Sequence, residues 1–173
     1  RGSPMRSELA NKTLEAARRV NRTIATAESC TGGMVSAALT EIAGSSDVVV
    51  CGFTTYANSA KEMMLGVAPE TLAQHGAVTM EVAEQMAKGA VARSDALTSV
   101  SITGIAGPGS SDFKPEGRVC VALFDEPTDT CLTETIEFGA LGRTHVRSAA
   151  LDHALSKLIR FFESQLLCVS PIN

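Results

Sequence analysis

Hydrophobic positions along the chain follow two alternating patterns. Apolar residues that recur about every three to four positions are typical of a buried helix face, and short β-branched or apolar runs are typical of strands. The first pattern predicts helices over 9–20, 31–42, 58–65, 82–91 and 143–167, with a further helical turn over 69–76. The second pattern predicts strands over 23–27, 47–56, 97–103, 118–124 and 131–138.

This order of elements predicts a fold of the α/β class. Alternating helices and strands bury their apolar faces when the helices are layered on a sheet. The segment 125–129, between the last two predicted strands, is short and polar. So short a connection favours an antiparallel hairpin. We therefore expect a mixed, mostly parallel sheet of about five strands.

Length and composition indicate one globular domain. The chain has 173 residues, of which 45% are hydrophobic and 20% are charged, as expected for a domain with its own core. We expect residues 1–4 to be a cloning remnant and 5–173 to form the domain. A net charge of −4, one Tyr and no Trp argue against nucleic-acid binding, which uses a basic face and stacking aromatic residues.

The sequence also gives no sign of a membrane or metal function. No run approaches the roughly 20 apolar residues of a membrane span, and the N-terminus has no apolar signal segment. The cysteines are five in number and spread widely, without a CxxC pair. This spacing does not favour a zinc site. We expect no metal, no membrane association, and a location in the reducing cytoplasm.

A candidate nucleophile lies between the first predicted strand and the helix that follows it, in the segment Ala27-Glu28-Ser29-Cys30-Thr31-Gly32-Gly33. A strand–turn–helix connection exposes backbone N–H groups that can stabilise an oxyanion. Ser29 is therefore a candidate nucleophile. In the alternative, Ser29 or Thr31 only caps the helix. Cys30 is a rival nucleophile, because a helix N-terminus lowers a thiol pKa, or it is an inert buried residue.

A serine nucleophile needs a base, and Lys61 is the candidate. It follows Tyr56-Ala57-Asn58, where a predicted strand passes into a helix. A lysine in a dry pocket has a lowered pKa and can act as a base. The alternative is a solvated helix lysine. The histidines are not favoured, because they lie at a helix end or on the last helix: His75, His145 and His153.

A glycine-rich segment, Thr103-Gly104-Ile105-Ala106-Gly107-Pro108-Gly109, follows the third predicted strand. Glycines let a backbone approach a ligand closely, but the pattern matches neither a Walker A loop nor GxGxxG. Arg143, at the start of the last helix, suits a phosphate. The alternatives are a plain connection and a surface arginine. If the strands are parallel, these loops meet at one sheet edge.

In this order, the segments closely resemble the CinA C-terminal domain family, also called PncC or nicotinamide-nucleotide amidase. The resemblance rests on these segments together with Leu65-Gly66-Val67, His75-Gly76-Ala77-Val78 and the stretch from Phe138-Gly139 to Arg143. It covers about residues 8–167 of the chain. It implies a three-layer α/β/α sandwich with a mixed sheet. One departure is Ser110-Ser111-Asp112, where glycine is common in the family, and this predicts a stiffer loop.

The resemblance implies an enzyme that deamidates nicotinamide mononucleotide to nicotinic acid mononucleotide and ammonia, without a cofactor. It implies Ser29 as nucleophile, Lys61 as base and Tyr56 beside them. It also implies that the protein is a homodimer and that its substrate is a small nucleotide. The substrate-binding residues that it implies are Glu28, Cys30, Thr31, Gly32, Gly33, Asn58, Thr103, Gly104, Gly107, Pro108, Gly109 and Arg143.

In the expected reaction, neutral Lys61 takes the proton of Ser29, and Ser29 attacks the carboxamide carbon. Backbone N–H groups at the start of a helix that begins at Thr31 stabilise the oxyanion. Water then hydrolyses the acyl-enzyme. The alternative function is a binding module that holds a nucleotide without chemistry and regulates a partner in competence or the DNA-damage response.

Overall fold

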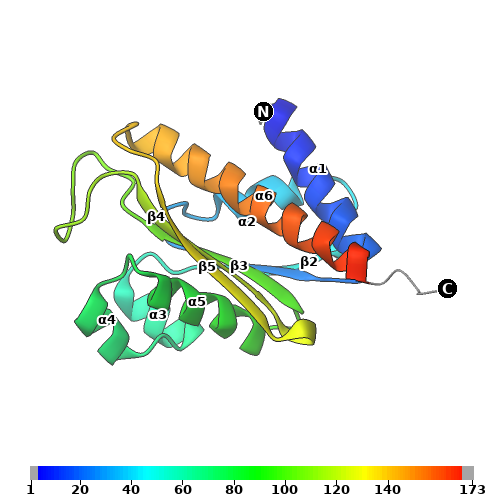
Figure 1. The fold of residues 1–173 in the computed structure, drawn as a ribbon, viewed down its shortest axis with the longest axis horizontal. Coiled ribbons are helices and arrows are strands. Elements are labelled where there is room, and N and C mark those ends of the chain that lie inside the picture. The colour runs from blue at the N-terminus through cyan, green and yellow to red at the C-terminus, as the bar shows by residue number, and fades with distance from the viewer. Residues whose placement is uncertain (1–3, 169–173) are drawn as a thin grey trace.

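A five-stranded sheet forms the centre of the computed structural model, which describes residues 4–168 (Figure 1). In sheet order, the strands are β2 (Val49–Thr54), β1 (Ile24–Glu28), β3 (Thr98–Gly104), β4 (Arg118–Asp125) and β5 (Thr130–Glu137). Strands β2, β1 and β3 pair in parallel, whereas β4 is antiparallel to both of its neighbours. The predicted mixed sheet and its final hairpin are therefore confirmed.

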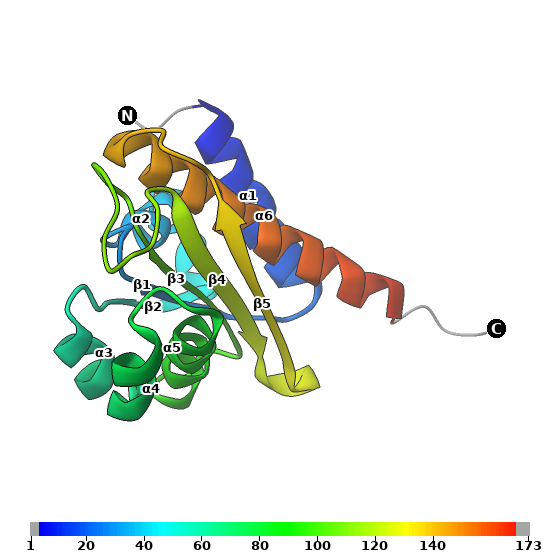
Figure 2. The ribbon, with the colours of Figure 1, turned by 60° about the vertical axis from the view of Figure 1, so that its left-hand side comes forward.

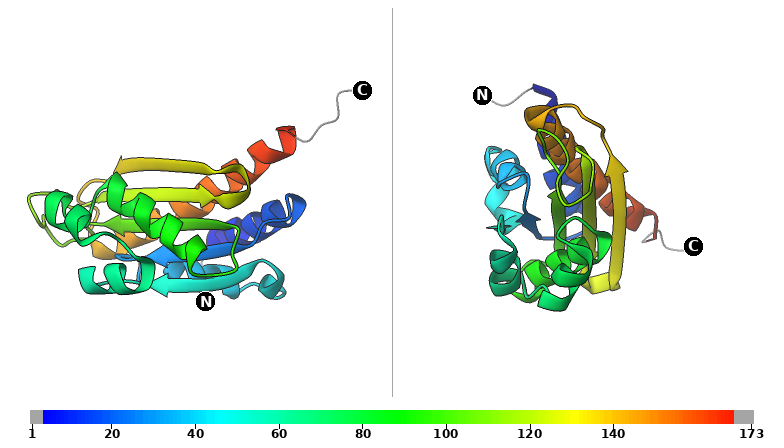
Figure 3. Two further views of the ribbon diagram at one scale, coloured as in Figure 1. Left: turned by 90° about the horizontal axis from the view of Figure 1, so that it is seen from below. Right: turned by 90° about the vertical axis from the view of Figure 1, so that its left-hand side faces the viewer.

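Helices cover both faces of the sheet, so the three-layer α/β/α expectation is confirmed (Figures 2 and 3). One layer contains α1 (Pro4–Arg19), α2 (Met34–Thr40) and α6 (Arg143–Cys168). The other contains α3 (Asn58–Leu65), α4 (Pro69–His75) and α5 (Met80–Ala92). Two single 3₁₀ turns, η1 (Ser45–Asp47) and η2 (Glu126–Thr128), complete the elements. Within residues 4–168, no helix has the length and apolarity needed to cross a bilayer.

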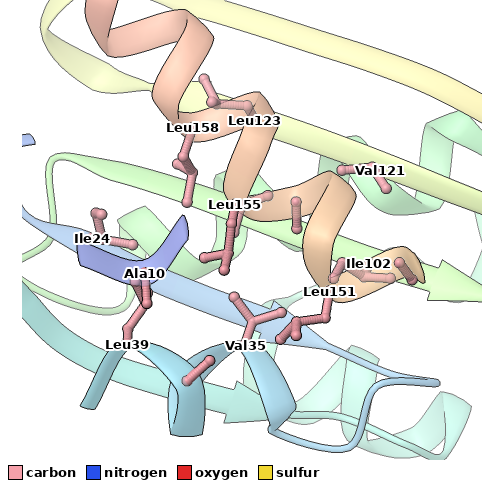
Figure 4. Close-up of a cluster of buried hydrophobic side chains, with 14 of the residues drawn as sticks. Ala10, Ile24, Val35, Leu39, Ile102, Val121, Leu123, Leu151, Leu155 and Leu158 are labelled. Atoms are coloured by element: carbon pink, nitrogen blue, oxygen red, sulfur yellow. The ribbon is translucent and has the colours of Figure 1, made fainter. Parts of the chain in front are cut away.

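The two faces of the sheet pack differently. Large aliphatic side chains fill the α1–α2–α6 side, including Val35, Ile102, Leu151 and Leu155 (Figure 4). On the α5 side, small residues let the helix lie close to the sheet. There the hydroxyls of Ser99 and Ser101 donate to main-chain carbonyls of α5, at 2.6 and 2.5 Å. These buried hydroxyls are therefore satisfied within the core.

The elements lie where the sequence predicts them, but several bounds differ: α1 begins at Pro4 and not at residue 9, and β2 covers Val49–Thr54 and not 47–56. Helix α3 has the predicted bounds, and Thr79 caps α5 by accepting a hydrogen bond from the N–H of Val82. Helix α2, however, begins at Met34 and not at Thr31. Gly32 and Gly33 have φ angles of +59° and +96°, which breaks the helical path before Met34. The N-cap is Gly33 with no side-chain hydrogen bond, so the expectation that Ser29 or Thr31 caps this helix is wrong.

Candidate active site

The carboxyl ends of the three parallel strands bring the candidate loops together. Ser29 follows β1 directly, Tyr56 follows β2, and Gly104 ends β3. The register pairs Glu28 with Thr54 on one side and with Ile102 on the other. Parallel strands in open α/β sheets bind ligands at this edge, and the structure confirms that the loops converge there.

Lys61 lies beneath Ser29 and is almost completely buried, with a relative exposure of 1%. Its Nζ is 3.0 Å from the Ser29 Oγ. It also donates to the carbonyls of Thr55 and Tyr56, at 2.8 and 3.2 Å. Burial lowers the pKa of Lys61 to about 8, because a charged amine is poorly solvated there. The alternative of a solvated lysine is therefore wrong.

This environment suits a neutral amine that acts as a base. A neutral lysine has two N–H donors and one lone pair, and the carbonyls of Thr55 and Tyr56 take two donors. The lone pair then remains for the hydroxyl of Ser29, which becomes the donor. The arrangement can therefore remove a proton from Ser29 without a histidine or a carboxylate.

The turn that carries Ser29 is fixed from outside the site by Arg147 on α6. Its guanidinium donates to the carbonyls of Cys30 and Thr31, at 3.0 and 3.4 Å. The N–H of Gly32 donates to the carbonyl of Ser29. Within residues 4–168, no hydrogen bond from the N–H groups of Cys30 and Thr31 is found. These two groups follow the candidate nucleophile directly and are available as oxyanion donors.

Glu28 occupies the N-terminus of α2. Its buried carboxylate accepts hydrogen bonds from the N–H groups of Val35 and Ser36, at 2.9 and 3.1 Å. The N–H groups of Val35 and Ser36 at the start of α2 are thus used inside the protein and are not free for an oxyanion. Glu28 holds α2 against β1, and it is not among the residues that line the cavity above Ser29 and Lys61.

A cavity of about 170 Å³ opens above Ser29 and Lys61, and we call it the inner compartment. A second cavity of about 380 Å³, the outer compartment, lies along the glycine-rich loop and shares part of its lining with the first. The inner compartment is lined by Ser29, Cys30, Tyr56, Asn58, Lys61, Ala77, Val78, Thr103, Gly104, Ile105, Ala106, Asp112 and Arg143. The outer one is lined by Tyr56, Arg143 and residues 104–111.

Most of the expected site residues line one of these compartments. Thr31, Gly32 and Gly33 do not; they form the turn behind Ser29. Sequence reasoning missed Ala77, Val78 and Asp112 as lining residues. Ala77 and Val78 come from the connection between α4 and α5, and the hydroxyl of Thr103 donates to the carbonyl of Ala77 at 2.9 Å. This long-range contact has no local signal in the sequence.

Arg143 spans the boundary between the two compartments. It donates to the carbonyl of Gly107 at 2.8 Å and to the hydroxyl of Tyr56 at 3.0 Å. Tyr56 thus contacts Lys61 through its carbonyl and Arg143 through its phenol. A positive guanidinium at this position gives the outer compartment a group that can bind an anion.

The glycine-rich loop is tied down by two charged side chains. Lys114 donates to the carbonyls of His75 and Val78. Glu116 accepts from the N–H groups of Gly109 and Gly142, at 2.6 and 3.1 Å. Gly107 has φ +88°, and a Cβ there would lie 2.2 Å from the Glu116 carboxylate. The loop therefore requires glycine at this position.

Other candidate chemistries are less well placed. Burial raises the pKa of the Cys30 thiol to about 11, so this cysteine stays protonated at neutral pH. His75, His145 and His153 all lie within the described part of the chain, and none of them lines either compartment. Residues 4–168 contain no group of three or more His, Cys, Asp or Glu side chains that could hold a metal ion.

The fold and the site define an α/β domain with a buried serine–lysine pair at the carboxyl edge of its parallel strands. The family model described as CinA C-terminal domain matches residues 6–162. The chain belongs to this family. It is 50% identical over 142 residues to a CinA-like protein of Mycolicibacterium gilvum, covering 80% of this chain and 33% of that protein. The chain thus spans about a third of the length of such CinA-like relatives.

A shorter relative has a more specific name. The nicotinamide-nucleotide amidohydrolase PncC of Escherichia coli strain K12 is 50% identical over 117 residues, covering 67% of this chain and 71% of that protein. Among solved structures, the competence/damage inducible protein CihA of Agrobacterium tumefaciens has a TM-score of 0.85 and 47% identity, covering 90% of this chain and 94% of that one. A CinA superfamily protein of Klebsiella pneumoniae has a TM-score of 0.87 and 30% identity, covering 92% and 98%.

Proposed function

We propose that this protein hydrolyses the carboxamide of nicotinamide mononucleotide, giving nicotinic acid mononucleotide and ammonia. The observation that carries the proposal is the contact of Ser29 with a buried Lys61 whose other donors are taken by carbonyls. A serine with an amine base is a known solution for acyl transfer. The substrate follows from the name of the Escherichia coli relative.

In the first half of the reaction, the Ser29 hydroxyl gives its proton to Lys61 while its oxygen forms a bond to the carboxamide carbon. The C–O double bond becomes an oxyanion, which the N–H groups of Cys30 and Thr31 stabilise. The oxyanion then collapses, the C–N bond breaks, and Lys61 returns the proton to the leaving nitrogen. Ammonia leaves, and an ester of Ser29 remains.

In the second half, a water molecule attacks this ester and Lys61 takes its proton. The second tetrahedral intermediate collapses to the carboxylic acid as the bond to the Ser29 oxygen breaks, and Lys61 returns its proton to that oxygen. The acid then releases its own proton to solvent and departs as the carboxylate. Because Lys61 alternates between neutral and charged forms, a pKa of about 8 is well matched to its role near neutral pH.

The two compartments divide the substrate between them in this proposal. The inner one, at about 170 Å³, takes the pyridine ring with its carboxamide above Ser29. Ligand pockets usually measure roughly 300–1,000 Å³, so a whole mononucleotide extends into the outer compartment. There Arg143 and the hydroxyls of Ser110 and Ser111 are the groups that suit its phosphate.

The proposal is tested by incubating the purified protein with nicotinamide mononucleotide and measuring ammonia and nicotinic acid mononucleotide. Ser29→Ala and Lys61→Met run in parallel, with circular dichroism to verify folding. We expect product from the wild type and none above background from either variant. Wild-type turnover by folded Ser29→Ala would overturn the mechanism. Saturable nucleotide binding by the wild type without product would instead favour the non-catalytic binding module.

A further inference from the structure

Asp112 occupies an unusual position at the tip of the loop between β3 and β4. Ser111 and Lys114 exchange both main-chain hydrogen bonds, at 3.0 and 2.9 Å, and so close a two-residue turn. Asp112 and Phe113 both have positive φ, +50° and +61°. This is the pattern of a type I′ turn, whose central residues are usually Asn or Asp followed by Gly.

The turn is fixed in place although its backbone is unfavourable for Phe113. A bulky residue in the left-handed region is a true outlier, and such strain persists only where surrounding contacts enforce it. Here Lys114 anchors the turn by donating to the carbonyls of His75 and Val78. The anchor sets Asp112 at the inner compartment, whereas Phe113 is fully exposed to solvent.

Asp112 brings a carboxylate to a lining that otherwise holds cationic and uncharged groups. Lys61 and Arg143 are the basic side chains of the inner compartment, and among the residues described Asp112 is its one acidic side chain. Within residues 4–168, no group donates a hydrogen bond to this carboxylate and no cation pairs with it. It therefore offers acceptors to a ligand.

The chemistry of a mononucleotide leaves one part for these acceptors. A phosphate is repelled by a carboxylate and is better placed near Arg143. The carboxamide is placed over Ser29 by the reaction. The ribose remains, and its vicinal hydroxyls are donors that carboxylates bind well in other nucleotide sites. We propose that Asp112 accepts hydrogen bonds from the ribose 2′- and 3′-hydroxyls and so selects ribonucleotides. This inference rests on the proposed function and deepens it.

The backbone conformation determines which variants are informative. Glycine and asparagine both tolerate positive φ, so Asp112→Gly removes the carboxylate and Asp112→Asn neutralises it without straining the turn. Asp129 provides a matched control. It is an exposed aspartate with φ +49° in the β4–β5 turn, at the other end of the sheet. Asp129→Gly therefore makes the same chemical change away from the cavity.

The test is a calorimetric titration in a Ser29→Ala background, where turnover cannot deplete the ligand. The ligands are nicotinamide mononucleotide and its 2′,3′-dideoxy analogue. Hydrogen bonds to a charged group support an expected loss of about ten- to hundredfold in affinity for the mononucleotide on adding Asp112→Gly. The affinity for the dideoxy analogue should not change, and Asp129→Gly should change neither. The affinity of Asp112→Asn for the mononucleotide should lie between that of Asp112→Gly and that of the Ser29→Ala parent.

Two results would overturn the ribose contact. In the first, Asp112→Gly has no effect on either ligand. In the second, Asp112→Gly and Asp112→Asn weaken both ligands equally, which would assign the carboxylate to the positive charge of the pyridinium ring. Absence of any nucleotide binding would overturn this inference together with the proposed function. If Asp112→Gly weakened binding of the mononucleotide alone, and the protein with Ser29 intact gave no product, only the proposed reaction would be overturned.

Discussion

The Nζ of Lys61 lies 3.0 Å from the Oγ of Ser29, although the two residues are 32 positions apart in the chain. The sheet register produces this contact. Strands β1 and β2 are parallel neighbours, and Thr55 donates its N–H to the carbonyl of Glu28 just before Ser29. Helix α3 begins at Asn58 and returns Lys61 beneath this junction. A parallel strand pair and one helical turn are thus enough to assemble the pair.

The first prediction concerns the pH dependence of activity. Only neutral Lys61 can take the proton of Ser29, and its pKa is about 8. We therefore expect kcat/KM to rise with pH and to be half-maximal near pH 8, because kcat/KM reports the free enzyme's ionisations. Initial rates of ammonia release in overlapping buffers measure this profile. A profile that stays flat across this pH would exclude Lys61 as the base.

The second prediction concerns the pH dependence of stability. The pKa of Lys61 is lower in the folded protein, about 8, than its ordinary value of 10.5. Between these values the unfolded chain binds more protons, so the stability of the wild type rises with pH. Relative to Lys61→Met, the free energy of unfolding should increase by about 3 kcal/mol in total across this window.

Urea denaturation of both proteins at several pH values between these limits measures this difference. The control is Lys88→Met, because Lys88 is exposed on α5 and pairs with Glu84. The difference in free energy of unfolding between the wild type and Lys88→Met should not increase over this pH range. A constant difference between the wild type and Lys61→Met would mean that Lys61 is not desolvated in the folded protein.

The third prediction separates Ser29 from its neighbour Cys30. Burial raises the pKa of this thiol to about 11, so a thiolate nucleophile is scarce at neutral pH. Cys30→Ala should keep a kcat within about threefold of the wild type, since it removes a small hydrophobic side chain beside the nucleophile. Thiol-directed alkylation of the wild type at neutral pH should leave Cys30 unmodified by mass spectrometry. Loss of activity in a folded Cys30→Ala protein would revive the rival nucleophile.

The sequence was sufficient for the elements because their signals are local. Helix α3 has an apolar face that ends at Gly66, and the prediction of its bounds was confirmed. The polar connection 125–129 predicted the hairpin of β4 and β5, which the antiparallel pairing confirms. Both signals are contained within a few residues, so no tertiary information was needed to read them.

The site required tertiary information that the sequence does not carry locally. The sequence predicts the start of α2 too early, because the two glycines after Thr31 adopt positive φ. The first N–H groups of α2 donate to Glu28, which the local sequence does not indicate. The sequence did not predict that Asp112 lines the cavity, because its place there depends on the distant contacts of Lys114. The burial of Lys61 could not be read from its spacing either.

The fourth prediction concerns Gly89, where α5 passes α3. Alanine is normally favoured over glycine inside a helix. Here a Cβ would lie 1.9 Å from the carbonyl oxygen of Leu65, and that oxygen is fixed by Arg93. Gly89→Ala should therefore destabilise the fold by about 1–3 kcal/mol. Thermal denaturation measures this, with Lys88→Ala as the neighbouring control. A stabilised Gly89→Ala protein would show that α3 can move away without cost.

The fifth prediction concerns Arg147, which we expect to act as a positioning residue. A trans peptide directs its C=O and N–H to opposite sides. By holding the carbonyl of Cys30, Arg147 therefore directs the N–H of Thr31 away from α6. Arg147→Met should lower kcat by about a hundredfold, because small misplacements of catalytic groups have effects of this size. KM should change little, since Arg147 does not line either compartment.

The kcat and KM values of three variants distinguish positioning from general destabilisation. Arg147→Lys retains one cationic donor nitrogen and should recover part of the lost kcat. Arg160→Met, an exposed arginine on the same helix, should behave as the wild type. If Arg147→Met instead raised KM and left kcat intact, the arginine would be acting on substrate binding. If it lowered the melting temperature while the folded fraction kept full kcat, its bonds to the turn would be structural alone, and another group would have to orient the oxyanion donors.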